Sequence, residues 1–174
     1  MLKTILISIP ILFILGSLLH FAYDYSNKNK IVGLFAPVNE SIFEHSKILL
    51  TPLLLFWFVL FFFIKEEVNC DIYFFTTLVS IIVSIITMIS FYYTYTGIIG
   101  YDKGFINILD LLISFVTGQL VANHVYTYSK GIPWILSILF IIFILLSFIY
   151  LTFNPLKIPL FYDKKSKTYG INKK

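Results

Sequence analysis

The sequence has no arginine, a single cysteine and few charged residues. All 13 of its basic residues are lysines, so it lacks the bidentate clamp by which arginine binds phosphate or carboxylate groups. Because Cys70 has no second cysteine to pair with, an internal disulfide is excluded. Charged residues make up 13% of the chain, whereas soluble domains average about 25%. This deficit argues against a water-soluble protein and against a nucleic-acid-binding surface.

Hydrophobic residues are abundant instead, at 59% of the 174 residues. A soluble core of this size could not bury so many apolar side chains, so the solvent must be lipid. Five apolar segments are long enough to cross a hydrocarbon core of about 30 Å as helices. The sequence therefore predicts an all-α integral membrane bundle, a single transmembrane domain over residues 1–174 with five transmembrane helices. The predicted spans are residues 4–25, 39–64, 72–96, 105–128 and 133–153.

The lysines are divided unequally between the two membrane sides that five spans define. Ten lie in or beside the first loop, in the 97–104 loop or in the tail from residue 154, and three lie on the other side. Basic residues are enriched in cytoplasmic loops, so we place the N-terminus outside and a basic tail, residues 154–174, in the cytoplasm. The lack of arginine and the abundance of Ile, Phe, Tyr and Asn indicate an AT-rich bacterial genome. The predicted location is therefore the bacterial cytoplasmic (plasma) membrane.

Ionisable residues gather where the first span ends and the second begins. His20 and Asp24 are four residues apart, which places them on one face of the first helix. Glu40 and Glu44 have the same spacing and would share a face of the second helix if that helix begins at residue 39. His45 follows directly. Because a short loop joins the two spans on one membrane side, we expect these residues at a similar depth on neighbouring helices. Ionisable groups at this depth are costly and mark candidate functional sites.

The fourth span adds Asp110, which lies in an otherwise apolar stretch that enters the membrane from the same side. The Asp110 carboxylate is therefore a candidate to line the same site from a second direction. His124 lies much farther along this helix, near the opposite membrane face, and is not expected to join the site. The candidate catalytic residues are Glu40, Glu44 and Asp110. The candidate metal ligands are His20, His45 and Glu44.

A simpler interpretation of part of this cluster is structural. Lys47 lies three residues after Glu44, which is the spacing of an ion pair on one helix face. In that case Glu44 and Lys47 would only stabilise the start of the second helix. The small-residue face of the third span is likewise typical of helix packing in membranes.

Residues 20–24 (HFAYD) and 37–47 (PVNESIFEHSK) resemble a signature of small bacterial multi-pass membrane proteins. The pattern in that family is H-F-x-Y-D followed by P-V-N-E-S-x-[WF]-E-H-x-K. The match covers the first two spans and their loop. The family has no assigned activity, so the resemblance implies a fold and a candidate site without a reaction.

Three functions remain open for this polar cluster at the cytoplasmic membrane edge. The first is a protein of unknown activity, non-catalytic or a partner subunit, in which the cluster only fixes helix packing. The second is a metal-dependent intramembrane enzyme acting on a lipid or membrane-embedded substrate, with zinc, iron or manganese as the divalent metal. The third is a proton-linked carrier or channel. The expected partner is the lipid bilayer and no nucleic acid, while a protein partner or homo-oligomer is left open.

Overall fold

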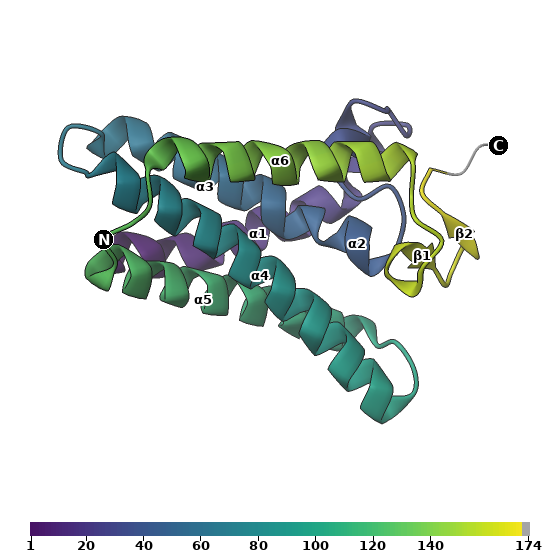
Figure 1. Cartoon of the computed structure of the whole chain (residues 1–174). Coiled ribbons are helices and arrows are strands. Elements are labelled where there is room, and N and C mark those ends of the chain that lie inside the picture. The colour runs from purple at the N-terminus through teal and green to yellow at the C-terminus, as the bar shows by residue number, and fades with distance from the viewer. Residues whose placement is uncertain (172–174) are drawn as a thin grey trace.

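The computed structural model describes residues 1–171, which form a helical bundle with a short β-hairpin at one end (Figure 1). Five helical segments in it are long and apolar enough to cross a membrane, which confirms the all-α bundle and fits a multi-pass membrane protein. The helices are α1 (Leu2–Tyr25), α2 (Ile42–His45), α3 (Lys47–Ile64), α4 (Cys70–Ile99), α5 (Gly104–Tyr128) and α6 (Trp134–Phe153). The second span consists of α2 and α3 with Ser46 between them.

The tail after α6 is folded where the structure describes it. It contains the 3-10 helix η2 (Pro159–Phe161) and the antiparallel strands β1 (Tyr162–Asp163) and β2 (Thr168–Tyr169). A second short 3-10 helix, η1 (Val32–Leu34), lies in the loop between α1 and α2. The N-terminus lies at the opposite end of the bundle from the hairpin (Figure 1), as expected for an odd number of spans.

Local sequence signals set the ends of the longest helix, α4. Asn69 caps its start, because its side-chain oxygen accepts hydrogen bonds from the backbone N–H groups of Asp71 and Ile72. Gly100 ends it with a φ of 85°, a left-handed conformation that glycine adopts at little cost. With 30 residues, α4 is about 45 Å long and exceeds the hydrocarbon thickness. Its C-terminal end diverges from α3 and α6 near the hairpin end (Figure 1).

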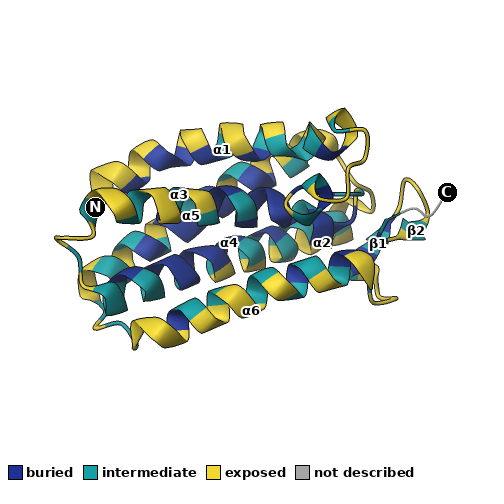
Figure 2. Ribbon diagram, turned by 90° about the horizontal axis from the view of Figure 1, so that it is seen from above, coloured by how far each residue is buried: buried dark blue, intermediate teal, exposed yellow. Residues whose placement is uncertain are grey.

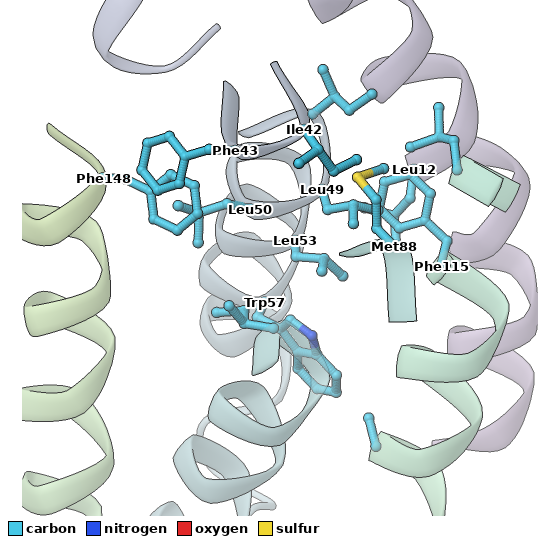
Figure 3. Packing of buried hydrophobic residues seen from close by; sticks show 14 of the residues in the cluster. Leu12, Ile42, Phe43, Leu49, Leu50, Leu53, Trp57, Met88, Phe115 and Phe148 are labelled. Atoms are coloured by element: carbon cyan, nitrogen blue, oxygen red, sulfur yellow. The ribbon is translucent and has the colours of Figure 1, made fainter. Parts of the chain in front are cut away.

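The helices bury one face each and expose the other to the surroundings. Exposed residues follow the outward faces of α1 and α6, while buried residues line the helix contacts (Figure 2). Leu49, Leu53 and Trp57 follow one another along α3 and belong to the hydrophobic core of the bundle (Figure 3). Large exposed apolar side chains on most of the helices fit a lipid environment rather than water.

Polar side chains also join helices inside the bundle. Gln119 on α5 donates from Nε2 to Ser8 Oγ at 2.7 Å, and its Oε1 accepts from Ser80 Oγ at 2.9 Å. All three side chains are buried. Hydrogen bonds between Ser and Gln side chains are a common way to fix helix contacts in membranes. This agrees with the packing role predicted for the small residues of the third span.

Replacing Gly118 by alanine is expected to lower the free energy of unfolding by about 1–3 kcal/mol, the usual cost of overpacking. A Cβ atom there would lie 1.9 Å from Ser84 Oγ and 2.9 Å from the carbonyl oxygen of Ser80, so α4 and α5 would have to separate. Thermal unfolding in detergent measures the change. Gly97→Ala is the matched control, since a Cβ at Gly97 meets no atom of residues 1–171 within 4 Å apart from its chain neighbours and the nearby backbone of its own helix. Equal melting temperatures of the two variants would contradict the prediction.

Candidate metal centre

Three side chains converge at the hairpin end of the bundle. His20 lies near the end of α1, Glu40 lies just before α2, and His45 is the last residue of α2. His20 Nε2 is 3.9 Å from Glu40 Oε1, and His45 Nε2 is 3.5 Å from Glu40 Oε2. One potential ligand atom from each residue lies within 4.8 Å of the other two. We call these three residues the His–Glu–His group.

The orientation of His45 is fixed by the backbone of its own helix. His45 Nδ1 lies 3.1 Å from the carbonyl oxygen of Ser41. Because a carbonyl oxygen only accepts hydrogen bonds, this contact assigns the proton to Nδ1 and leaves the Nε2 lone pair free. Metal-bound histidines usually have such a carbonyl or carboxylate partner on the second nitrogen. The rings of His20 and His45 stack with centroids 5.0 Å apart.

The position at which α2 begins explains why the Glu40 and Glu44 side chains contact different partners. Ser41 caps the helix, since its Oγ accepts from the backbone N–H of Glu44 at 3.3 Å. Asn39 lies before the cap, where its side-chain oxygen accepts from the backbone N–H of Ser41. Glu40 therefore precedes the helix. The expectation of one shared helix face for Glu40 and Glu44 was wrong because the helix begins at Ile42 rather than at residue 39.

Glu44 is engaged with Lys47 instead of with the His–Glu–His group. Its Oε2 lies 2.7 Å from Lys47 Nζ and accepts a hydrogen bond from the backbone N–H of Val38 at 3.0 Å. Lys47 Nζ also donates to the carbonyl oxygen of Gly33 at 2.7 Å. Both charged side chains are almost fully buried. The predicted Glu44–Lys47 pair is thus confirmed, and it ties α2 and α3 to the loop that carries Glu40.

The His–Glu–His group lies on the wall of a cavity of about 430 Å³ between α1, α2, the start of α5 and the hairpin. Its polar wall includes Asp102, Asn107 and Lys165 in addition to the group itself. Its apolar wall consists of Phe21, Ile48, Ile108 and Leu111. The cavity lining therefore combines polar and apolar side chains, which suits an amphiphilic ligand.

The other predicted residues lie around this site or away from it. Asp110 is buried, accepts from Ser114 Oγ at 3.2 Å and lines a small pocket of about 30 Å³ together with Glu40 and His45. Asp24 is exposed on the last turn of α1, and Glu40 rather than Asp24 faces His20. His124 is exposed and packs on the Tyr128 ring in the last turns of α5, away from the His–Glu–His group, as expected.

Sequence reasoning missed Asp102, which lines both pockets. Its Oδ1 accepts hydrogen bonds from Tyr95 Oη at 2.7 Å and from Asn107 Nδ2 at 2.8 Å. This leaves the second carboxylate oxygen available. A signal was present in the sequence, because the count of spans places the 97–104 loop on the same membrane side as Glu40 and His45.

Lys165 of the hairpin was also missed. Its Nζ lies 3.4 Å from Glu40 Oε1, so the tail predicted as a basic segment reaches the site. Two contacts hold the tail there: Asn39 Nδ2 donates to the carbonyl oxygen of Gly170 at 3.0 Å, and the Phe161 and Phe43 rings lie 4.3 Å apart. Local sequence could not reveal this, since the contacts join residues more than a hundred positions apart.

The turn that presents Lys165 is stabilised by Asp163. Burial alone would raise the pKa of the Asp163 carboxyl, but hydrogen bonds from Ser166 Oγ and from the backbone N–H of Lys165 hold that pKa below its usual range. The carboxylate therefore stays charged at neutral pH and keeps the turn closed. This places the Lys165 ammonium group beside Glu40 in a folded segment.

Comparison with known proteins places the whole described chain in one family. Residues 1–171 match the family model DUF6512, a family of unknown function. No curated protein and no solved structure matches the chain. The predicted lack of a known activity agrees with this family, while the signature of residues 20–24 and 37–47 and the bacterial origin stay predictions. The chain therefore belongs to DUF6512, a family of unknown function.

Proposed function

We propose that this chain is a metal-dependent membrane enzyme that acts on a lipid or another membrane-embedded substrate. In this proposal His20, Glu40 and His45 bind one divalent cation at the polar wall of the cavity. The observation that carries the proposal is the approach of their three ligand atoms to within 4.8 Å of one another beside a cavity of about 430 Å³.

The spacing of the donors supports a metal ion. With metal–ligand bonds of about 2.0–2.1 Å, two ligands of a tetrahedral zinc ion lie roughly 3.3 Å apart. The two Nε2-to-oxygen distances of 3.5 and 3.9 Å exceed this by only a few tenths of an ångström, and small side-chain movements would bring all three ligand atoms, which lie within 4.8 Å of one another, around one ion. Catalytic zinc sites have three protein ligands and a fourth position open to water or substrate. Mixed imidazole and carboxylate ligands also suit iron and manganese.

The exposure of the group favours a site over a packing contact. The side chains of His20, His45 and Glu40 are 28%, 16% and 36% exposed, so each has surface that faces the cavity. The Glu44–Lys47 pair is the contrasting case, because it is almost fully buried and hydrogen-bonded to the backbone. We therefore assign the structural role predicted for the cluster to Glu44 and Lys47 and the chemical role to the His–Glu–His group.

The proposed reaction is hydrolysis by metal-bound water. A zinc ion lowers the pKa of its bound water to about 7, which supplies a hydroxide near neutral pH. Hydrolysis would replace the bond between the electrophilic carbon or phosphorus of the substrate and its leaving group by a bond to a water oxygen. Asp102 is the carboxylate best placed to take the water proton and return it to the leaving group, because it lines the cavity and is oriented by Tyr95 and Asn107.

The apolar wall supports entry of the substrate from the membrane. Phe21 on α1 and Ile108 on α5 line the cavity and are both more than half exposed. Both belong to helices long and apolar enough to span the bilayer. A hydrocarbon chain could therefore contact them while its polar end meets the His–Glu–His group.

Metal content tests this proposal directly. The protein purified in a nonionic detergent without chelator is expected to contain about one equivalent of zinc, iron or manganese by mass spectrometry. Removal of the metal should lower the melting temperature, and zinc at a thousand times its dissociation constant should restore about 4 kcal/mol of stability. A folded sample that contains no metal and shows no thermal shift with zinc, iron(II) or manganese(II) would overturn the proposal.

A further inference from the structure

We infer that the substrate is an amphiphile with a phosphate head group, which Lys165 binds beside the metal while the hydrocarbon chain lies against Phe21 and Ile108. This inference rests on the proposed function, because it names the substrate class of the same site. Three features of the cavity carry it: the charge of its wall, the position of Lys165, and the presence of apolar side chains beside the polar ones.

The charge of the cavity wall changes sign when a divalent cation binds. Its ionised side chains are Glu40, Asp102 and Lys165, which give one net negative charge if the histidines are neutral. A cation of charge two converts this into one net positive charge. A metal-loaded cavity with net positive charge and low-dielectric apolar walls attracts an anion and disfavours a cationic head group.

Lys165 is positioned to contact that anion. Its Nζ lies 3.4 Å from Glu40 Oε1, yet its side chain is 73% exposed, so it can turn from Glu40 towards a ligand without losing buried contacts. When Glu40 binds a metal, part of its negative charge is neutralised and its attraction for Lys165 weakens. Lysine is a frequent phosphate ligand that acts as a point charge, and among the described residues that line the cavity Lys165 is the one with a cationic ammonium group.

The backbone around Lys165 is held in place before a ligand arrives. The segments that flank the hairpin are joined to the loop before α2 by the Asn39–Gly170 hydrogen bond and to α2 by the Phe161–Phe43 contact. Asp163 accepts hydrogen bonds from the backbone N–H of Lys165 and from Ser166 Oγ within the turn. Only the Lys165 side chain has to move, which keeps the entropic cost of binding small.

The apolar wall distinguishes a lipid phosphate from free phosphate. Phe21, Ile108 and Leu111 lie on the same cavity as Lys165, so a chain attached to the phosphate would bury apolar surface that inorganic phosphate cannot. Each buried methylene group is expected to raise the affinity about fourfold. Dodecyl phosphate should therefore bind much more tightly than inorganic phosphate, even though both carry the same charged group.

Cobalt(II)-loaded protein in dodecyl maltoside provides a test in which the two proposals fail separately. Cobalt uptake with a visible ligand-field spectrum is measured first, and its absence would count against the proposed function. Dodecyl phosphate is then titrated at fixed detergent concentration and the change in that spectrum is followed. We expect dodecyl phosphate to change the spectrum at a concentration at least about tenfold lower than the concentration of inorganic phosphate that does so. Dodecyltrimethylammonium should cause no change.

The variant Lys165→Gln is expected to weaken dodecyl phosphate binding about tenfold, the usual effect of one charge-assisted hydrogen bond. Lys157→Gln is the matched control, because it removes the same charge from an exposed position of the same tail and should bind as the unmodified protein does. Equal affinities of the two variants, equal potency of inorganic phosphate, or no spectral response in cobalt-loaded protein would each overturn the inference. Equal cobalt uptake by both variants verifies that they are folded.

Discussion

Replacing His45 by alanine is expected to abolish stoichiometric metal binding, with a loss of affinity of about a hundredfold or more. Loss of a residue that only orients a ligand costs about 10–100-fold in affinity, and His45 is proposed as a ligand itself. Its Nε2 lies 3.5 Å from Glu40 Oε2, and its Nδ1 is already held by the carbonyl oxygen of Ser41. An alanine leaves His20 and Glu40 alone, which is too few protein ligands for a stable zinc site.

Metal content and cobalt spectra of the purified variant measure this loss. His124→Ala is the matched control, because it removes an exposed histidine in the last turns of α5, away from the site, and should keep about one equivalent of metal. His20→Ala should behave as His45→Ala does. A His45→Ala protein that retains a full equivalent of metal would show that the ion binds elsewhere.

The bundle itself could be predicted because the bilayer leaves few alternatives. Backbone groups in hydrocarbon must bond within their own segment, so long apolar runs become helices. The predicted starts at residues 39 and 72 differ from the observed starts at Ile42 and Cys70. At both places a side-chain cap, Ser41 or Asn69, decides where the helix begins. Hydropathy does not report such caps, so it locates the spans better than it locates their ends.

The candidate site could be predicted only in part. Because the first loop joins two spans on one side of the membrane, the sequence predicted a similar depth for His20, Glu40 and His45. The structure places these three side chains together. The start of α2 determines whether Glu40 or Glu44 faces the histidines. Residues before the cap, such as Glu40, do not follow helical periodicity. Glu44 therefore joins Lys47. The pairing of Lys165 with Glu40 depended on tertiary contacts of the tail, which no local pattern in the sequence encodes.

Breaking the buried Glu44–Lys47 ion pair is expected to have a large effect on stability. Replacing Lys47 by methionine is expected to lower the free energy of unfolding by about 3–5 kcal/mol, since the Glu44 charge would stay buried without its partner. The Gly33 carbonyl oxygen would also lose its hydrogen bond from Nζ. Unfolding in mixed dodecyl maltoside and dodecyl sulfate micelles measures the change. Lys65→Met is the matched control, because Lys65 is exposed after α3 and its loss should change stability by less than about 0.5 kcal/mol.

The double variant Glu44→Gln/Lys47→Met decides between a structural and a chemical role for Glu44. It removes both buried charges and keeps side chains of similar size, so it should be more stable than Lys47→Met alone. If Glu44 only holds the loop through Val38 and Lys47, the folded double variant keeps its metal. If that protein is folded yet binds no metal while Lys65→Met binds a full equivalent, Glu44 is a ligand after all, and the assignment of the site to His20, Glu40 and His45 is wrong.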